Sequence, residues 1–316
     1  MVRHPILGLH HVTATVAGAQ HDLDCYAGSL AMRLVKKTVN FDNHNVYHFY
    51  YGDEQGSPGT IWTTFPYQGW GVPAGATGSG QITATAFSVP AGAVGYWKKR
   101  LSDAGVTPEE GKARFGETAI AFRDPSGLLI ELVATERDQR PPWRGPGVEP
   151  DCAVRGLHSV TMVVRSPGPT LDLLTGLLGF TVVDQVGGRT RVAVQGDEPG
   201  KTIDIVHDAQ APPGRNGTGT VHHVALAISS ADQQILMRQE LVRLGYAVTE
   251  VMDRCYFRSI YFREPGGVLF ELATVEPGFT VDEDLASLGQ GLKLPPWEEP
   301  NRPMIEERLP RITLKG

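Results

Sequence analysis

The sequence predicts an α+β protein of four βαβββ units, which form two curved mixed sheets that each enclose a cavity, with the helices outside. The first observation behind this prediction is an internal repeat. The frame Gly-Leu-His-x-Val-Thr occupies residues 8–13 and recurs at residues 156–161, which is 148 residues later. The frame Arg-Asp/Glu-Pro-x-Gly-x-Leu-x-Glu-Leu occupies residues 123–132 and recurs at residues 263–272, which is 140 residues later. Such repeats indicate tandem copies of one structural unit.

The repeats divide the chain into two expected halves, residues 1–150 and 151–316. Each half divides again, because it contains two strand-like segments that are each followed by a helix-like segment. The four βαβββ units are expected at residues 8–66, 81–136, 156–207 and 221–276. Residues 277–316 are rich in proline and polar side chains. We expect this C-terminal extension to wrap over the surface in an extended form.

The first strand and the helix are the clearest elements of each unit. The first strands are predicted to begin near Leu9, Gln81, Leu157 and Val221, and the helices to cover residues 20–33, 92–105, 170–179 and 232–245. Glycines at positions 105, 179 and 245 stand where a helix commonly ends. Helical spacing predicts two helix faces, Leu173, Leu174, Leu177 and Leu178 in one helix and Ile235, Leu236, Gln239 and Val242 in another. Alternating runs with glycine-rich turns, such as residues 255–262 and 267–275, complete the units.

Composition excludes several classes of protein. The 316 residues include 41% hydrophobic and 20% charged side chains, which is typical of a globular chain with a sizeable core. The formal net charge of −6 argues against a nucleic-acid partner. No apolar run reaches the roughly 18 residues of a membrane-spanning helix, and the first residues do not resemble a secretion signal, so we expect a cytoplasmic protein. The cysteines Cys25, Cys152 and Cys255 are odd in number and far apart, which favours packing roles over disulfides.

Strand alternation separates the side chains that face a helix from those that face the cavity. In the first strand His11 shares a face with threonines, and in residues 221–228 His223 shares a face with alanines. In residues 267–275 Glu271 shares a face with Leu269 and Ala273, while bulkier side chains occupy the other face. The faces with small and polar residues should line the cavity. Two imidazoles and one carboxylate on three strands form the pattern of the 2-His-1-carboxylate site, which suits Fe(II) or Mn(II).

A structural role is the ordinary explanation for any one of these residues taken alone. Two His-His doublets that each open an apolar strand are harder to explain in that way. Glu271 lies between Phe270 and Leu272 in the middle of a strand, where an unpaired carboxylate would be costly to bury. The repeat supplies an internal comparison, because the counterparts of His11, His223 and Glu271 are Ser159, Ala84 and Glu131. Only one set can bind a metal, so the first and fourth units should share one cavity, and the second and third units the other.

At these residues the chain resembles the vicinal oxygen chelate superfamily, and more narrowly its bacterial ring-cleaving dioxygenases that act on hydroquinones. The resemblance covers nearly the whole chain. Its motifs are GLHHVT (8–13), GSPGTIWTTFP (56–66), RFG (114–116), HH (222–223), YFRSIYFREPGGVLFE (256–271) and GFTVDEDLASLG (278–289). It implies His11, His223 and Glu271 as metal ligands, in agreement with the alternation argument, and Fe(II) as the metal, with Mn(II) as the alternative.

The resemblance also implies the residues beside the metal. Arg254 and Tyr261 match catalytic and substrate-binding positions, His10 and His222 match catalytic positions, and Thr13 matches a substrate-binding position. It further implies a hydroquinone or catechol-like substrate and O₂, with no nucleic-acid or membrane partner and with self-association left open. We expect Arg254 or Tyr261 to stabilise a bound phenolate by hydrogen bonding. No partner is expected for His44 or His48.

Two other functions compete with ring cleavage. A metal-dependent lyase or isomerase of the glyoxalase type would need a fourth protein ligand, often a second glutamate, and no second inward carboxylate is evident near His11. A metal-free binding protein of the bleomycin-resistance type would leave His11, His223 and Glu271 without a role.

Overall fold

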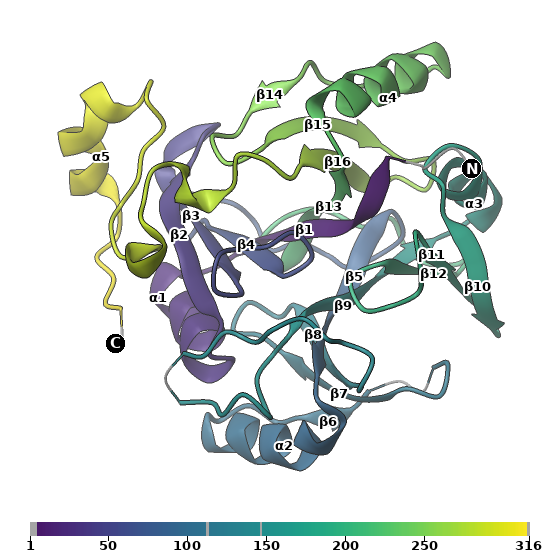
Figure 1. The fold of residues 1–316 in the computed structure, drawn as a ribbon, viewed down its shortest axis with the longest axis horizontal. Coiled ribbons are helices and arrows are strands. Elements are labelled where there is room, and N and C mark those ends of the chain that lie inside the picture. Colours follow the sequence, from purple (N-terminus) through teal and green to yellow (C-terminus); the bar gives the residue numbers. More distant parts are fainter. Residues whose placement is uncertain (1–4, 112–113, 146, 315–316) are drawn as a thin grey trace.

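Two eight-stranded mixed sheets make up the computed structural model, which describes residues 5–111, 114–145 and 147–314 (Figure 1). The first sheet has the strand order β14 (Met252–Asp253), β15 (Arg258–Arg263), β16 (Leu269–Thr274), β13 (Thr220–Ile228), β1 (Ile6–Val16), β4 (Ile61–Pro66), β3 (Asn43–Gly52), β2 (Arg33–Asn40). The second has the order β10 (Thr181–Val186), β11 (Arg189–Ala193), β12 (Thr202–His207), β9 (Gly156–Val164), β5 (Gln81–Val89), β8 (Leu129–Ala134), β7 (Thr118–Arg123), β6 (Glu109–Glu110).

The strand order confirms the predicted pairing of the four units. The first sheet combines the first unit with the fourth, and the second sheet combines the second unit with the third. The first strands of the paired units meet in antiparallel register at the centre of each sheet, β1 with β13 and β5 with β9. The two sheets therefore do not correspond to the two halves of the sequence. This arrangement brings strands from the two ends of the chain side by side.

The helices follow the first strand of each unit, as the sequence predicts. They are α1 (Ala19–Leu23), α2 (Val94–Asp103), α3 (Pro167–Gly176) and α4 (Ala231–Arg243). Gly105, Gly179 and Gly245 have φ values of 77°, 77° and 91°, so each adopts the left-handed conformation expected of a residue that ends a helix. The prediction of one helix over residues 20–33 was wrong. After Leu23 the chain continues as a π-helical segment, η1 (Asp24–Ser29), and Arg33 already begins β2.

The helical face predicted from residues 235, 236, 239 and 242 is not the buried face of α4. Ile235, Leu236 and Val242 are exposed, whereas Gln234, Met237 and Leu241 are buried. The Gln234 amide donates hydrogen bonds to the backbone carbonyls of Arg258 and Leu272, so a polar side chain faces the sheet at this position. The face predicted for the helix of the third unit does face the core, because Leu173, Leu174 and Leu178 are all buried.

The C-terminal extension is not simply extended. It contains the short helical segments η3 (Phe279–Val281), η4 (Leu285–Ser287) and η5 (Glu299–Asn301), and the helix α5 (Arg302–Arg308) beside β3 (Figure 1). Lys36 on β2 is fully buried, and its ammonium group lies 2.5 Å from Asp282 and from Glu283. The extension is therefore attached to the first unit by ion pairs to a buried lysine.

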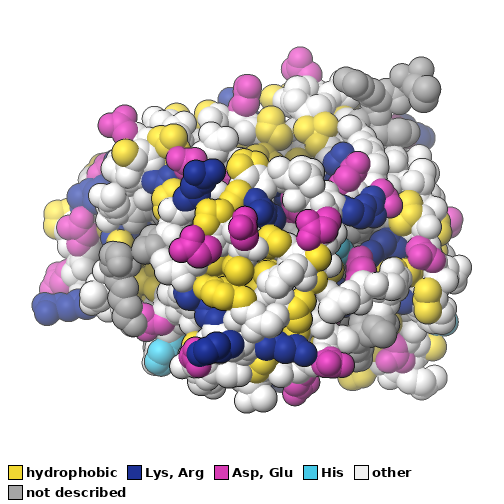
Figure 2. All heavy atoms as spheres, turned by 60° about the horizontal axis from the view of Figure 1, so that its bottom comes forward, with side chains coloured by type: hydrophobic (Ala, Val, Ile, Leu, Met, Phe, Trp, Pro, Cys, Tyr) yellow, Lys and Arg dark blue, Asp and Glu magenta, His cyan; other side chains and the backbone are white. Residues whose placement is uncertain are grey.

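The surface carries both signs of charge. Basic and acidic side chains are interspersed over the face shown in Figure 2, and neither sign forms a continuous field there. None of the helices in the described ranges is long and apolar enough to span a bilayer.

Candidate metal centre

Three side chains from β1, β13 and β16 converge at the centre of the first sheet. Nε2 of His11 lies 3.2 Å from Nε2 of His223 and 3.2 Å from Oε2 of Glu271. Nε2 of His223 lies 2.9 Å from the same carboxylate oxygen. All three side chains are buried, and within the described ranges this is the group of His, Cys, Asp and Glu side chains that could bind a metal. The structure thus brings together the three ligands that the sequence predicts.

The register of the strands explains the convergence. His11 lies opposite Ala225 in the β1–β13 pair, and Ala225 lies opposite Glu271 in the β13–β16 pair. Thr13 lies opposite His223. The small side chain of Ala225 therefore separates the first histidine from the glutamate and leaves space between them.

Each histidine of the candidate site is oriented by the preceding histidine. Nδ1 of His10 lies 2.8 Å from Nδ1 of His11, and the second doublet repeats this contact between His222 and His223 at the same distance. A histidine that binds a metal through Nε2 carries its proton on Nδ1. His11 and His223 would then donate that proton to His10 and His222, which leaves both Nε2 lone pairs directed at the centre.

A metal cation fits this arrangement. Oε2 of Glu271 is buried and has no hydrogen-bond donor among the described residues, although two imidazole nitrogens lie within 3.2 Å. Three lone-pair donors facing one point repel each other unless a cation lies between them. Two metal–ligand bonds of about 2.1 Å that meet at a right angle place their ligand atoms about 3.0 Å apart. Two such bonds on opposite sides of the metal would place the ligand atoms about 4.2 Å apart. All three observed separations match the right-angled, facial arrangement.

Glu271 is present as a carboxylate. Burial by itself would raise its pKa, but His11 and His223 with protonated Nε2 atoms hold the pKa well below the usual range, and a metal cation in the same place would act in the same direction. Its other oxygen, Oε1, accepts a hydrogen bond from the hydroxyl of Ser259, which is fully buried on the neighbouring strand β15. The sequence analysis missed Ser259, because a single serine in a strand carries no motif.

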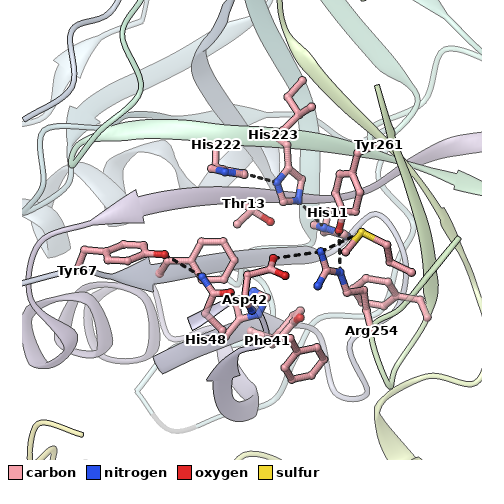
Figure 3. Close-up of a pocket in the computed structure, with 16 residues that line it drawn as sticks. His11, Thr13, Phe41, Asp42, His48, Tyr67, His222, His223, Arg254 and Tyr261 are labelled. Carbon is pink, nitrogen blue, oxygen red and sulfur yellow. Dashed lines mark hydrogen bonds and ion pairs between the residues drawn. The ribbon is translucent and has the colours of Figure 1, made fainter. Parts of the chain in front are cut away.

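A cavity of about 320 Å³ opens in front of His11 and His223 (Figure 3). His11, His223 and Tyr261 lie on one side of it, and Phe41, Asp42 and His48 lie on the opposite side. The lining residues are His11, Thr13, Asn40, Phe41, Asp42, His48, Tyr50, Phe65, Tyr67, His222, His223, Met252, Arg254, Phe257, Tyr261 and Leu269. Such a mixture of aromatic walls and a few polar groups suits a small aromatic ligand.

Arg254 and Tyr261 form a pair at the edge of the cavity. Nε of Arg254 donates a hydrogen bond to the Tyr261 hydroxyl at 3.2 Å, and the guanidinium also lies 3.4 Å from the Asp42 carboxylate. Tyr261 lies directly opposite Glu271 in the β15–β16 register. Burial, reinforced by the Glu271 charge, raises the pKa of Tyr261. The phenol therefore stays protonated, and since its oxygen accepts from Arg254, its own proton is free to point into the cavity.

The two other predicted histidines occupy different places. His222 lines the cavity, whereas His10 is buried behind His11, against the ring of Phe257 at 4.9 Å, and is not among the lining residues. Burial lowers the pKa of both imidazoles to about 3, and the neighbouring histidine of each doublet adds to this shift. Both are therefore neutral at physiological pH.

His48 and His44 both have partners, contrary to the prediction. His48 lines the cavity, and its Nε2 lies 2.7 Å from the hydroxyl of Thr63. Burial, together with His11 and His223, holds the pKa of His48 well below its usual value. His44 lies 3.0 Å from Glu298 of the C-terminal extension. Neither partner could be found from local sequence, because each lies on another strand or segment.

The second sheet carries the same positions, and its described residues form no candidate metal site. Ala86 lies opposite both Ser159 and Glu131, and Ala84 lies opposite Thr161, which reproduces the predicted counterparts in register. The guanidinium of Arg114 binds Glu131 through two parallel hydrogen bonds of 3.0 and 2.7 Å. At this buried glutamate the protein itself supplies the positive charge.

Comparison with known families agrees with the fold. The family described as Glyoxalase/Bleomycin resistance protein/Dioxygenase superfamily matches residues 8–132 and 156–272. These two segments cover most of both halves of the chain.

Curated relatives match almost the whole chain. MhqO of Bacillus subtilis (strain 168), provisionally named a ring-cleaving dioxygenase, is 42% identical over 305 residues, which cover 96% of this chain and 96% of the relative. Chlorohydroquinone/hydroquinone 1,2-dioxygenase of Sphingobium indicum is 37% identical over 295 residues, covering 92% and 91%. The crystal structure of a protein from Bacillus subtilis subsp. subtilis str. 168, provisionally named a dioxygenase, is 41% identical, with a TM-score of 0.93 over 98% of both chains.

Proposed function

The chain belongs to the Glyoxalase/Bleomycin resistance protein/Dioxygenase superfamily and to its ring-cleaving dioxygenases, and we propose that it opens hydroquinone-type or catechol-type rings with O₂ at a metal held by His11, His223 and Glu271. The single observation that carries the metal is the set of three separations between the ligand atoms, 3.2, 3.2 and 2.9 Å. A purely structural cluster has no reason to direct two imidazole nitrogens and an undonated carboxylate oxygen at one point.

We propose Fe(II) as the metal, with Mn(II) as the alternative. Two neutral nitrogens and one carboxylate suit both ions and leave three coordination positions for other ligands. When bound, such an ion favours ionisation of a coordinated ring hydroxyl and supplies the electron transfer between ring and O₂ that amino-acid side chains cannot provide.

The Arg254–Tyr261 pair is proposed to stabilise the ionised ring oxygen. The Tyr261 proton is free to point into the cavity, and Tyr261 lies opposite the Glu271 position in the sheet. Arg254 supplies a permanent positive charge behind the phenol, which favours an anion in front of it. Because its pKa is raised, Tyr261 is suited to donate a hydrogen bond rather than to remove a proton.

We propose different roles for His222 and His10. His222 is neutral and faces the cavity, and because its Nδ1 accepts the proton of His223, its Nε2 carries the ring proton and can donate a hydrogen bond to the substrate. His10 is neutral as well, but because it lies behind His11, its role is to orient the ligand and tune its basicity. This is a positioning role rather than the catalytic contact that the sequence resemblance implies.

Asp42 is the acidic residue among those that line the cavity. It lies on the opposite side of the cavity in an ion pair with Arg254, not against the two histidines. The geometry therefore favours ring cleavage over glyoxalase-type chemistry, which calls for a second carboxylate at the metal. A metal-free binding function would leave the converging ligand atoms unexplained.

The test combines metal loading with O₂ uptake. Protein purified without oxygen is reconstituted with Fe(II) or Mn(II), passed through a desalting column, and supplied with hydroquinone and catechol while O₂ is monitored. We expect metal-dependent uptake of one O₂ per ring and loss of the aromatic ultraviolet band. Turnover without O₂, or equal turnover by the metal-free protein, would rule the proposal out.

A further inference from the structure

Two arginines occupy equivalent places in the two sheets. Arg114 precedes β7 and Arg254 precedes β15. They stand 140 residues apart (254 − 114), which is also the offset between the repeated frames that contain the two buried glutamates. Each arginine is followed by a non-glycine residue in the left-handed conformation, Phe115 with a φ of 48° and Cys255 with a φ of 64°. The two side chains therefore start from the same kind of backbone position.

The two arginines nevertheless have different partners. Arg114 donates hydrogen bonds of 3.0 and 2.7 Å to both oxygens of the glutamate in its own sheet. Arg254 instead donates from Nε to the Tyr261 hydroxyl at 3.2 Å, and its Nη2 lies 3.4 Å from the Asp42 carboxylate (Figure 3). Among the described residues, the carboxylate that pairs with Arg254 is Asp42 and not Glu271. Oε2 of Glu271 is thereby left without a donor.

A tyrosine in the first sheet replaces an alanine in the second. Tyr261 lies directly opposite Glu271 in the β15–β16 pair, and Ala121 lies directly opposite Glu131 in the β7–β8 pair. The methyl group of Ala121 leaves room beside the carboxylate for a guanidinium. In the first sheet the phenol ring stands at that position, and its hydroxyl accepts a hydrogen bond from Arg254. Tyr261 therefore both obstructs the approach to the glutamate and binds the arginine.

Asp42 is a second anchor that the other sheet lacks. It lies in the turn between β2 and β3, whereas the equivalent turn between β10 and β11 consists of the two glycines at 187–188. The turn of Asp42 is fixed, because the Asp42 amide donates a hydrogen bond of 2.9 Å to the side chain of Asn40. The ring of the adjacent Phe41 packs edge-on against Trp297 of the C-terminal extension, with the centroids 5.6 Å apart.

We propose that Tyr261 and Asp42 are positioning residues for the metal site, which hold Arg254 away from Glu271 and so keep that carboxylate available to the metal. This inference rests on the metal site of the proposed function. Without the two anchors, Arg254 pairs with Glu271 as its counterpart pairs with the glutamate of the second sheet. A guanidinium that binds both carboxylate oxygens takes the place of the metal. Arg254 is thus a competitor for the site that the chain itself carries.

The test removes both anchors and then removes the competitor as well. The dissociation constant for Fe(II) is measured without oxygen, by competition with a coloured chelator, and the Tm of the metal-free protein is measured alongside. The proteins are the wild type, the double variant D42A/Y261A and the triple variant D42A/Y261A/R254M. The matched control is D172A/Y246A, which makes the same two changes outside the cavity.

The expected result is a loss of Fe(II) affinity that a further substitution reverses. D42A/Y261A should bind Fe(II) about 10- to 100-fold more weakly than the wild type, the usual effect of residues that support a metal ligand. Adding R254M should restore the affinity to within about threefold of the wild type. The same R254M change should lower the Tm of the metal-free double variant, because it leaves Glu271 buried without a counter-charge. A cavity that is merely loosened would not move affinity and Tm in opposite directions.

Two results would overturn the inference: a double variant that binds Fe(II) like the wild type, or a triple variant that binds it as weakly as the double variant. If D42A/Y261A does not fold, D42A/Y261V replaces it, because valine suits a strand and still lacks the ring and the hydroxyl. A wild type that binds no Fe(II) would contradict the proposed function itself. A wild type that binds Fe(II), together with an unaffected double variant, would contradict the inference alone.

Discussion

Glu271 and Glu131 occupy equivalent register positions in the two sheets, yet one faces two imidazoles and the other a guanidinium. Each is buried, and each has a positive charge or a candidate cation site beside it. In the second sheet the protein's own Arg114 neutralises the carboxylate. In the first, the undonated Oε2 of Glu271 leaves that place to a bound cation. Because of this difference between two copies of one unit, we assign the metal to the first sheet.

Arg114 should be needed for stability but not for metal binding. Removing its charge in Arg114→Met leaves the Glu131 carboxylate buried without a counter-charge, which should cost about 3–5 kcal/mol in the free energy of unfolding. The double variant R114M/E131L should recover most of this, because an apolar pair avoids the buried charge. Urea unfolding measures both, with metal content as the control. A single variant as stable as the wild type would show that the pair is not a structural substitute for a cation.

Tyr261→Phe should lower turnover about 10²- to 10³-fold while substrate affinity changes little. In the proposed role the phenol donates to the ionised ring oxygen, whereas binding at the metal and burial of the ring would dominate affinity. O₂ consumption under saturating hydroquinone and anaerobic substrate titration give the two quantities. Tyr246→Phe, a change in a tyrosine outside the cavity, serves as the control. Unchanged turnover in Y261F would reduce Tyr261 to a packing residue.

Asp22 should make the protein less stable as the pH rises from about 4 to about 7. Burial raises the pKa of Asp22 to about 7, although hydrogen bonds from Thr64 and Tyr51 partly oppose this shift. The folded chain then binds the proton more tightly than the unfolded chain, whose aspartate pKa is about 3.9. The contribution of Asp22 to stability is therefore complete below about pH 4 and is lost as the pH approaches 7.

Asp22→Asn tests this, because the amide stays neutral at every pH. The difference in Tm between the variant and the wild type should grow in favour of the variant between pH 5 and pH 8. Taking this difference removes the contributions of His10 and His222, whose lowered pKa values act in the opposite direction. The exposed Asp172→Asn should track the wild type. A pH-independent difference for D22N would contradict the assignment.

Lys36 should couple the C-terminal extension to the cavity. Its ammonium group binds Asp282, Glu283 and the Phe279 carbonyl, and Asp282 also accepts a hydrogen bond from Tyr256, two residues from Arg254. Lys36→Met should cost about 3 kcal/mol, at the lower end for a buried pair because the Asp282 side chain is 32% exposed. Lys36→Met should also raise KM, because the segment between β14 and β15, which contains Tyr256 and Arg254, would be held less firmly. The neighbouring Lys37→Met should do neither. Normal KM in a destabilised K36M would show that the extension has no influence on the cavity.

Repetition made much of this fold predictable. Because each motif occurs twice, the boundaries of units, the pairing of distant strands and the counterparts of His11 and Glu271 could be worked out without a structure. Alternation in β1, β13 and β16 then placed three ligand candidates on one face. These inferences rely on periodicity, which a sequence displays directly.

Contacts between strands could not be predicted in the same way. His48 meets Thr63, and Glu271 meets Ser259, through register across neighbouring strands, and no local pattern marks these pairs. The inner face of α4 failed for a different reason. Gln234 is buried because two strand carbonyls accept its protons, so hydrogen bonding outweighed hydrophobic periodicity.

The amount of Fe(II) retained after anaerobic reconstitution and desalting tests the central claim most directly. The wild type and Glu131→Gln should each retain one Fe(II) per chain. Glu271→Gln should retain almost none while keeping its fold, because Gln preserves the volume between Phe270 and Leu272 but removes the only anionic ligand. Stoichiometric iron in E271Q, or loss of iron in E131Q, would show that the metal is not held by His11, His223 and Glu271.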